Sequence, residues 1–106
     1  MPTTFRLTYP TATVLLAVQA GHRYGFDVMD ATGLPDGTVY PILRRLEDHG
    51  ALTASWEAEE TARADGRPPR RFYQLTAEGS DAVERALARF PMLGRIMDLP
   101  SEPVTE

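Results

Sequence analysis

The sequence contains no cysteine and no lysine, and its only histidines are His22 and His49. Without cysteine, neither a disulfide framework nor a cysteine-based zinc finger can form, which is compatible with a reducing cytoplasm. The two histidines are not paired at the spacing that places both on one helix face, so we expect no metal site.

Long apolar segments and the usual catalytic combinations are also missing. No apolar run reaches the about 18 residues of a membrane span, and no basic segment followed by an apolar one marks a signal peptide. We see no Ser-His-Asp or Cys-His set and no glycine-rich phosphate loop. We therefore expect a cytoplasmic protein without a membrane segment or cofactor, and we do not expect an enzyme.

The balance of charge is acidic, but its distribution is uneven. The formal net charge is −4, whereas modules that bind nucleic acids are usually basic. Between Arg63 and Tyr73, however, there are four arginines and one aspartate, while the last eleven residues hold acids and no base. The distribution of charge therefore matters more than its sum.

The 106 residues allow one domain with a modest core, and the first half of the chain predicts three helices. Proline suits the first turn of a helix, threonine and aspartate suit its N-terminal cap, and glycine suits its end. By these signals the helices run from near Pro10, capped by Thr8 or Thr11, to Gly21; from about Tyr24 to Ala31, closed by Gly33; and from a cap at Asp36 to Gly50.

The third helix separates clearly into a buried and an exposed side. Its apolar residues recur at i, i+3, i+4 and i+7, which are one stripe on a helix: Val39, Ile42, Leu43 and Leu46. The other side carries small, hydroxylated and arginine side chains: Gly37, Thr38, Tyr40, Pro41, Arg44 and Arg45. A helix of this kind suits the major groove of DNA. The second and third helices therefore predict a helix-turn-helix.

After Gly50 the period of the pattern changes to two. Leu52, Ala54 and Trp56 alternate with polar residues, as in a half-buried strand, and a second strand is expected over 71–76. The segment EAEETARADGRPPR lies between them, is polar and rich in turn residues, and offers no apolar anchor. Three helices followed by a hairpin with a long basic loop are typical of a winged helix, in which the loop is the wing.

A further helix is predicted after Thr76, and Pro91 must kink or stop it. This helix has an apolar seam formed by Val83, Leu87, Phe90, Leu93 and Met97. We expect the seam to contact a partner helix; the alternative is that it packs inside a single chain. The expected fold class is mainly α with a small β-hairpin. We divide the chain into a winged helix-turn-helix domain (1–76), a C-terminal dimerisation helix (77–98) and a disordered tail (99–106).

Several blocks of the chain together resemble a known family. They are Tyr24-Gly25, GTVYPILRRLE from Gly37 to Glu47, Gly50, Trp56-Glu57, and GRPPRRFYQLTAEG from Gly66 to Gly79. In this order and spacing, over roughly residues 7–90, they are similar to the PadR-type transcriptional regulators. The resemblance implies a cytoplasmic bacterial regulator, usually a repressor, that binds an inverted-repeat operator as a homodimer. It further implies the short form of the family, with a single C-terminal dimerisation helix.

The sequence departs from that family at two places. Pro91 interrupts the C-terminal helix, which is often longer and continuous in the family. The only tryptophan, Trp56, lies in the first wing strand, whereas some short members bind flat aromatic drugs between tryptophans of the dimerisation helix. Drug sensing is therefore not carried over, and we expect Trp56 to belong to the core rather than to a ligand platform.

On the predicted recognition helix, Thr38, Tyr40 and Arg44 are the main candidates for DNA contact, next to Pro41 and Arg45. The Tyr40 hydroxyl would reach a phosphate, which positions the helix without reading sequence. Arg44 or Arg45 would fork onto guanine, a contact worth about 1–3 kcal/mol of discrimination. The alternative is a solvated arginine pair with ion pairs to Glu47 or Asp48.

In the wing, Arg67, Arg70 and Arg71 flank Pro68-Pro69, which stiffens the loop and lowers the entropy lost on binding. We expect these arginines to contact phosphates or the minor groove. The alternative is a loop whose positive charge is balanced by Glu57, Glu59 and Glu60. These three acids are expected either to be solvated or to act as electrostatic gates on the wing. Tyr24 would either face a phosphate at the start of the second helix or pack against the first helix.

The sequence thus predicts a sequence-specific DNA-binding regulator, expected to be a homodimeric repressor on a pseudo-palindromic operator of double-stranded DNA. A small-molecule effector is conceivable, but its identity is unknown. The alternative is a winged helix that contacts other proteins and has no DNA function, which the net charge of −4 favours.

Overall fold

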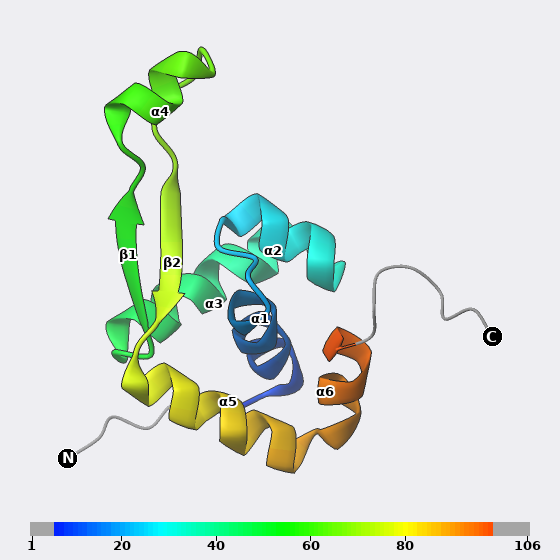
Figure 1. Ribbon diagram of the computed structural model, residues 1–106. Coiled ribbons are helices and arrows are strands. Elements are labelled where there is room, and N and C mark those ends of the chain that lie inside the picture. Colours follow the sequence, from blue (N-terminus) through cyan, green and yellow to red (C-terminus); the bar gives the residue numbers. More distant parts are fainter. Residues whose placement is uncertain (1–5, 99–106) are drawn as a thin grey trace.

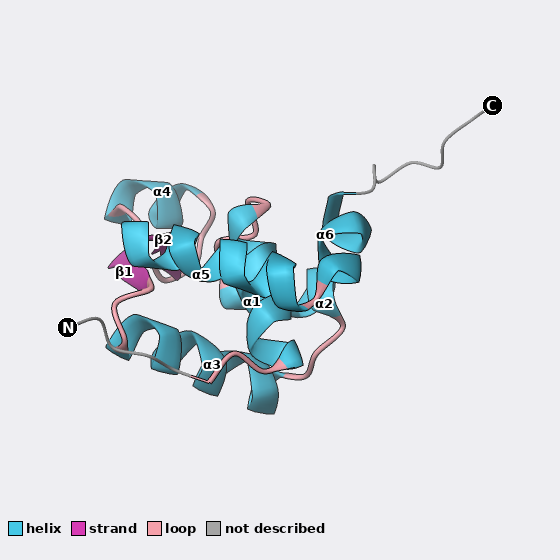
Figure 2. Ribbon diagram, turned by 90° about the horizontal axis from the view of Figure 1, so that it is seen from below, coloured by secondary structure: helices cyan, strands magenta, loops and turns pink. Residues whose placement is uncertain are grey.

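The computed structural model describes residues 6–98, with side chains up to residue 95, and it contains the predicted helices and hairpin. Helices α1 to α3, α5 and α6 form one body, and the hairpin projects from it with α4 at its tip (Figure 1). From below, the hairpin and α6 lie at opposite ends of the molecule (Figure 2). The elements are α1 (Tyr9–Gln19), α2 (Gly25–Thr32), α3 (Asp36–Asp48), β1 (Leu52–Trp56), α4 (Glu59–Ala64), β2 (Arg71–Leu75), α5 (Ala77–Arg89) and α6 (Pro91–Asp98).

This arrangement confirms the predicted fold class, a mainly helical winged helix-turn-helix with a two-stranded antiparallel hairpin. The tail predicted over 99–106 lies outside the described residues. Helix α1 is the centre of the core, since every residue from Thr11 to Val18 is buried and the helix contacts α2, α3, α5, α6 and β2. Of the two candidate caps, Thr8 caps it, because the Thr8 hydroxyl accepts the Thr11 N–H at 3.3 Å.

The start of α3 differs from the prediction. Asp36 was expected to cap the helix, but Pro35 occupies the cap and Asp36 is the first helical residue, with no side-chain capping bond. Proline cannot donate a hydrogen bond, and its extended backbone simply leads the chain into the helix. The carboxylate of Asp36 still lies in the first turn, where a negative charge is favourable.

The hairpin is joined to the helical body through α2 as well as through its own ends. Leu52 pairs with Leu75, Ala54 with Tyr73 and Trp56 with Arg71. Outside this ladder, Tyr24 forms an isolated bridge with Phe72, and the Tyr73 N–H donates to the Arg23 carbonyl at 2.8 Å. The residues just before α2 therefore act as a short third strand, which fixes the hairpin relative to the helix-turn-helix.

The wing loop is more ordered than its sequence predicts. It was expected to lack an apolar anchor, yet residues 59–64 form α4, and Ala62 is only 2% exposed. Acidic side chains in the first turn and Arg63 in the last turn complement the dipole of this short helix. The segment contains no glycine or proline to break a helix, and the small Ala62 side chain is buried.

The segment assigned to one dimerisation helix (77–98) is two helices, and the break lies at Pro91, where the sequence predicted a kink or a stop. Helix α5 ends at Arg89, Phe90 is its C-terminal cap, and Pro91 begins α6. Proline lacks the N–H that would continue the hydrogen bonds of α5, but it suits the first turn of a new helix. Helix α6 consequently turns back and packs against α1.

Candidate nucleic-acid interface

Helix α3 presents the two sides that its sequence predicts. The apolar stripe is buried in the core, with exposed fractions of 0% to 5%: Val39, Ile42, Leu43 and Leu46. On the opposite side Tyr40 is 45% exposed, and Pro41, Arg44 and Arg45 are exposed, while Thr38 is half-buried. The helix is thus held by its inner side and free to meet a partner with its outer side.

Arg44 and Arg45 form no ion pair with any residue of the described part of the chain. The alternative prediction, in which they pair with Glu47 or Asp48, does not hold in this structure. Glu47 instead accepts a hydrogen bond from the guanidinium of Arg71 in the wing, at 2.9 Å. Both arginines of α3 therefore keep their donors available to an external acceptor.

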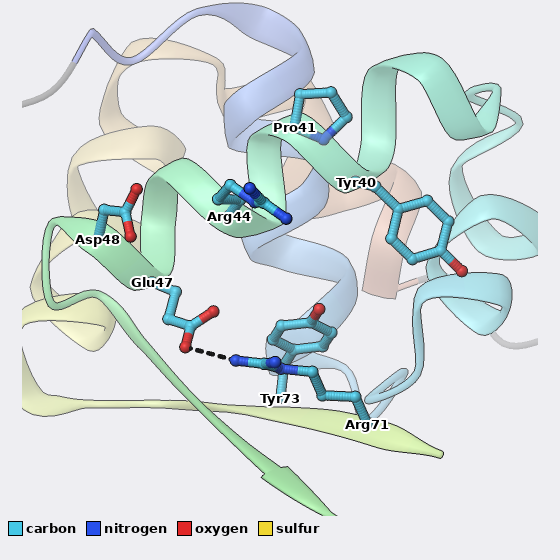
Figure 3. Close-up of a pocket in the computed structure, with 7 residues that line it drawn as sticks. All are labelled: Tyr40, Pro41, Arg44, Glu47, Asp48, Arg71 and Tyr73. Carbon is cyan, nitrogen blue, oxygen red and sulfur yellow. Dashed lines mark hydrogen bonds and ion pairs between the residues drawn. The ribbon is translucent and has the colours of Figure 1, made fainter. Parts of the chain in front are cut away.

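A groove runs between α3 and the second wing strand. Figure 3 shows Arg44 and Tyr40 on the α3 side and Arg71 with Tyr73 on the strand side, and the Glu47–Arg71 pair closes one part of it. Its volume is about 730 Å³, and Pro41 and Asp48 complete its lining. Burial raises the pKa of Tyr73, whose phenol forms the floor of this groove and remains neutral. Recognition helix and wing therefore share one concave, arginine-containing surface.

The position of Tyr40 depends on a glycine of α2. A Cβ atom at Gly25 would overlap the far end of the Tyr40 ring, including its hydroxyl oxygen. In Figure 3 the ring extends from α3 toward α2. Gly25 is therefore the residue that lets the Tyr40 ring lie against the start of α2.

Glu57 is the centre of a polar network that ties the wing to α2. Its carboxylate accepts hydrogen bonds from the Tyr24 hydroxyl (2.8 Å), from both terminal nitrogens of Arg67 (2.5 and 3.1 Å) and from the Arg70 main-chain N–H (3.0 Å). The side chain of Glu57 is 7% exposed. The Arg67 guanidinium, helped by the Tyr24 hydroxyl and the Arg70 amide, lowers the pKa of Glu57 from 4.5 to about 2.

This network changes the interpretation of three predicted residues. Glu57 was expected to be solvated like Glu59 and Glu60; those two are exposed, but Glu57 is not. Arg67 is 19% exposed and is held by Glu57 and by Asp65 at 3.1 Å, so its charge is already compensated within the wing. Tyr24 packs against the wing rather than against α1, and its bond to Glu57, together with burial, raises the pKa of its phenol.

The structure also corrects the position of Trp56, which was expected in the core. It is 64% exposed, because it is the last residue of β1, which leads away from the helical body. The Arg71 guanidinium lies 5.7 Å from the Trp56 ring. Arg71 is thus held between Glu47 of α3 and Trp56 of β1.

Sequence reasoning missed Phe26. This side chain is 41% exposed in the first turn of α2, stacks on Tyr24 and lies under the guanidinium of Arg70 at 4.6 Å. An exposed aromatic residue two positions after Tyr24 is a weak signal, because its partner Arg70 lies far along the chain.

The comparisons with known proteins identify the family of this surface. Residues 14–85, well over half of the chain, match the model of the PadR-like family of transcriptional regulators. The chain belongs to this family. It is therefore a PadR-like, DNA-binding regulator of transcription, and the family is one of regulators rather than of enzymes.

Solved structures share the PadR-like fold. A PadR family transcription regulator from Clostridium difficile R20291 is 21% identical, with a TM-score of 0.68 over 86% of this chain and 96% of that one. A PadR-like transcription factor from Bacteroides fragilis is 23% identical, with a TM-score of 0.63 over 80% and 82%. BpsR of Bordetella bronchiseptica is 24% identical, with a TM-score of 0.64 over 89% and 68%. No curated protein sequence matches this chain significantly.

In this PadR-like chain the residues predicted for dimerisation have different surroundings. Val83 and Leu93 are 2% and 3% exposed and belong to the core of the single chain, so they are not a partner surface. Leu87 and Phe90 are partly buried against the same core, and Phe90 meets Tyr9 edge to face at 5.3 Å. Met97 lies in α6, but its side chain is outside the described residues. Val83 is buried because α5 packs against α1, and Leu93 because the turn at Pro91 folds α6 back onto α1.

Among residues 6–98 no helix is long and apolar enough to cross a membrane. Within the same range, no three histidine, aspartate or glutamate side chains are grouped so that they could hold a metal ion.

Proposed function

We propose that this PadR-like regulator is a repressor that binds a pseudo-palindromic operator as a homodimer in the bacterial cytoplasm. The supporting observation is the outer side of α3, where Arg44 and Arg45 are exposed and have no ion-pair partner in the described chain, next to Tyr40 and the wing. In each subunit α3 enters the major groove, and the two half-sites lie roughly 10 bp apart or a small multiple of that.

The residues have separate roles in this proposal. Arg44 or Arg45 donates two hydrogen bonds to one guanine and so reads the sequence. Thr38 and Pro41 bring the helix close to the groove. Tyr40 donates its hydroxyl to a phosphate and sets the register of the helix. Tyr24 acts through Glu57 and the wing rather than by its own contact, since its hydroxyl is already donated to that carboxylate.

The test is fluorescence-anisotropy binding to DNA from upstream of the protein's own gene, compared with random duplex, across a salt series. Specific binding through six or more phosphates gives a steep loss of affinity with salt, with a log-log slope of about −0.9 for each phosphate contact. Arg44→Ala should reduce the preference for operator over random DNA by about 1–3 kcal/mol. Arg89→Ala, which removes an arginine from α5, is the matched control and should leave that preference unchanged.

A second function keeps the winged helix but uses it to contact other proteins. The net charge of −4 and the exposed Trp56 favour it. Weak binding to both duplexes with no dependence on sequence, from any promoter region tried, would support this alternative against the repressor.

A small-molecule effector is a further part of the proposal. BpsR, whose DNA binding is regulated by 6-hydroxynicotinic acid, has the same fold. An effector that changes the distance between the two recognition helices would release the operator. Compounds that raise the melting temperature and lower operator affinity together would identify it.

A further inference from the structure

The wing arginines Arg67, Arg70 and Arg71 differ in what holds their charged groups. Arg67 is enclosed by the carboxylates of Glu57 and Asp65, and Arg71 is paired with Glu47. The guanidinium of Arg70 has no carboxylate partner in the described part of the chain. Of these three, Arg70 therefore carries the charge that is least compensated by the protein itself.

Arg70 is nevertheless held in place. Its main-chain N–H donates to Glu57 at 3.0 Å, which fixes the backbone. Its guanidinium lies 4.6 Å from the centre of the Phe26 ring and 6.0 Å from that of Tyr24. These two rings are stacked at 5.5 Å with an angle of 19°, and they form one platform at the start of α2. A guanidinium on an aromatic face keeps its edge donors free for an anion.

The platform opens next to the recognition helix. A pocket of about 190 Å³ lies between α2, α3 and the wing, and it is lined by Arg70 and Arg71 together with Tyr24, Phe26 and Tyr40. The Arg70 side chain therefore lines the same pocket as Tyr40, the residue proposed to touch a phosphate. Holding the side chain beforehand lowers the entropy lost when it binds.

We propose that Phe26 is a positioning residue that holds Arg70 for contact with one DNA phosphate next to Tyr40, while Arg67 serves only to order the wing. This rests on the proposed DNA-binding function. The phosphate belongs to the DNA backbone, so the contact contributes affinity and register but no sequence preference.

The experiment measures operator and random-duplex binding across a salt series for the wild type, Phe26→Leu, Arg70→Ala and the double variant. Arg70→Ala should make the salt slope shallower by about 0.9 for each subunit, the value of one phosphate contact, and so by about 1.8 for the proposed dimer. Phe26→Leu removes the aromatic face and keeps an apolar side chain; it should weaken binding about two- to five-fold, equally for both duplexes. In the Arg70→Ala background the same exchange should have no further effect, and Phe26→Tyr should bind like the wild type.

Two controls distinguish a role of Phe26 in positioning Arg70 from a general loss of structure in the variants. Arg89 also lies over a ring, at 5.3 Å from Phe90, but it belongs to α5, so Arg89→Ala should leave the slope unchanged. In the free protein, NMR signals of the Arg70 side chain should be shifted by the ring current of Phe26 and should lose that shift in Phe26→Leu.

The inference is overturned if Phe26→Leu weakens binding by the same factor with and without Arg70, since Phe26 would then act on its own. An unchanged slope in Arg70→Ala would overturn it as well. In both cases the wild type still binds DNA, so the proposed function stands. If the wild type binds no duplex at all, the proposed function and this inference fail together.

Discussion

At the scale of single residues, the most consequential feature is one carboxylate with four donors around it. Glu57 gathers the Tyr24 hydroxyl, both Arg67 nitrogens and the Arg70 amide, and so connects α2 to both sides of the wing loop. Its charge balances the Arg67 guanidinium and strengthens the hydrogen bonds from the two neutral donors. Protonation of Glu57 therefore weakens the whole attachment of the wing at once.

This gives a pH dependence of stability with a defined sign. Because the pKa of Glu57 is lowered in the folded state from 4.5 to about 2, the carboxylate contributes stability that is fully present above pH 4.5. That contribution is lost as the pH falls from 4.5 toward 2. Urea unfolding of the wild type and of Glu57→Gln at several pH values should give a difference that shrinks over this window. A constant difference between the two would show that the charge of Glu57 is not what matters.

Gly25 provides a second prediction at this scale. In Gly25→Ala the new methyl group would overlap the end of the Tyr40 ring, which is an exposed and movable side chain. We expect the ring to swing away, with little change in the free energy of unfolding but a loss of operator affinity similar to that of Tyr40→Ala. Operator affinity is measured for Gly25→Ala, Tyr40→Ala and the double variant. If the two losses of affinity add in the double variant, displacement of the Tyr40 ring is not their shared cause.

At the scale of elements, the sequence predicted well those helices whose apolar positions face one core. The stripe of α3 lies buried as its spacing indicates, and the break at Pro91 separates α5 from α6. The predictions were less accurate where partners come from far along the chain. Helix α4 exists because Ala62 finds a buried position against the folded wing, and a count of local turn residues contains no sign of that contact.

The junction between the hairpin and α5 gives a prediction about close packing. At Gly79 a Cβ atom would overlap the main-chain oxygen of Ala51, which cannot swing aside as a side chain can. Gly79→Ala should therefore lower the free energy of unfolding by about 1–3 kcal/mol, the usual cost of overpacking.

Gly37→Ala is the matched control, because nothing lies within 4 Å of a Cβ atom there and the residue is helical. It should raise stability by up to about 1 kcal/mol. Urea unfolding of both variants checks the pair, and equal effects would show that the contact at Ala51 adds nothing.

At the scale of the whole molecule, the return of α6 onto α1 decides which C-terminal residues remain for a partner. Leu93 is 3% exposed and lies in the core, whereas its neighbour Met92 is 60% exposed. Tyr9 is 53% exposed as well, so Tyr9 and Met92 keep apolar surface outside the core of the single chain.

Leu93→Ala and Met92→Ser should consequently act on different quantities. The first removes core packing and should lower the free energy of unfolding by about 2–5 kcal/mol without changing the association constant of folded chains. The second removes an exposed apolar side chain, so it should lower the association constant of folded chains. It should leave the free energy of unfolding of the single chain nearly unchanged. Sedimentation at several concentrations together with urea unfolding checks both. Dissociation of a dimer by Leu93→Ala at full stability would contradict the core position of Leu93.

The sequence by itself determined α1, α2, α3 and α5, the hairpin and the buried side of α3, because hydrophobic period, caps and turn residues are local properties. The family of regulators followed from the likeness of whole motifs, not from these local signals. Only the tertiary structure decided which charges are already used. Arg67 and Arg71 have carboxylate partners, whereas Arg44, Arg45 and Arg70 have none among residues 6–95, although all five look alike in the sequence. The reason is physical: an ion pair or a stacked ring depends on distance in space, and Glu57 meets Tyr24 across 33 positions of chain.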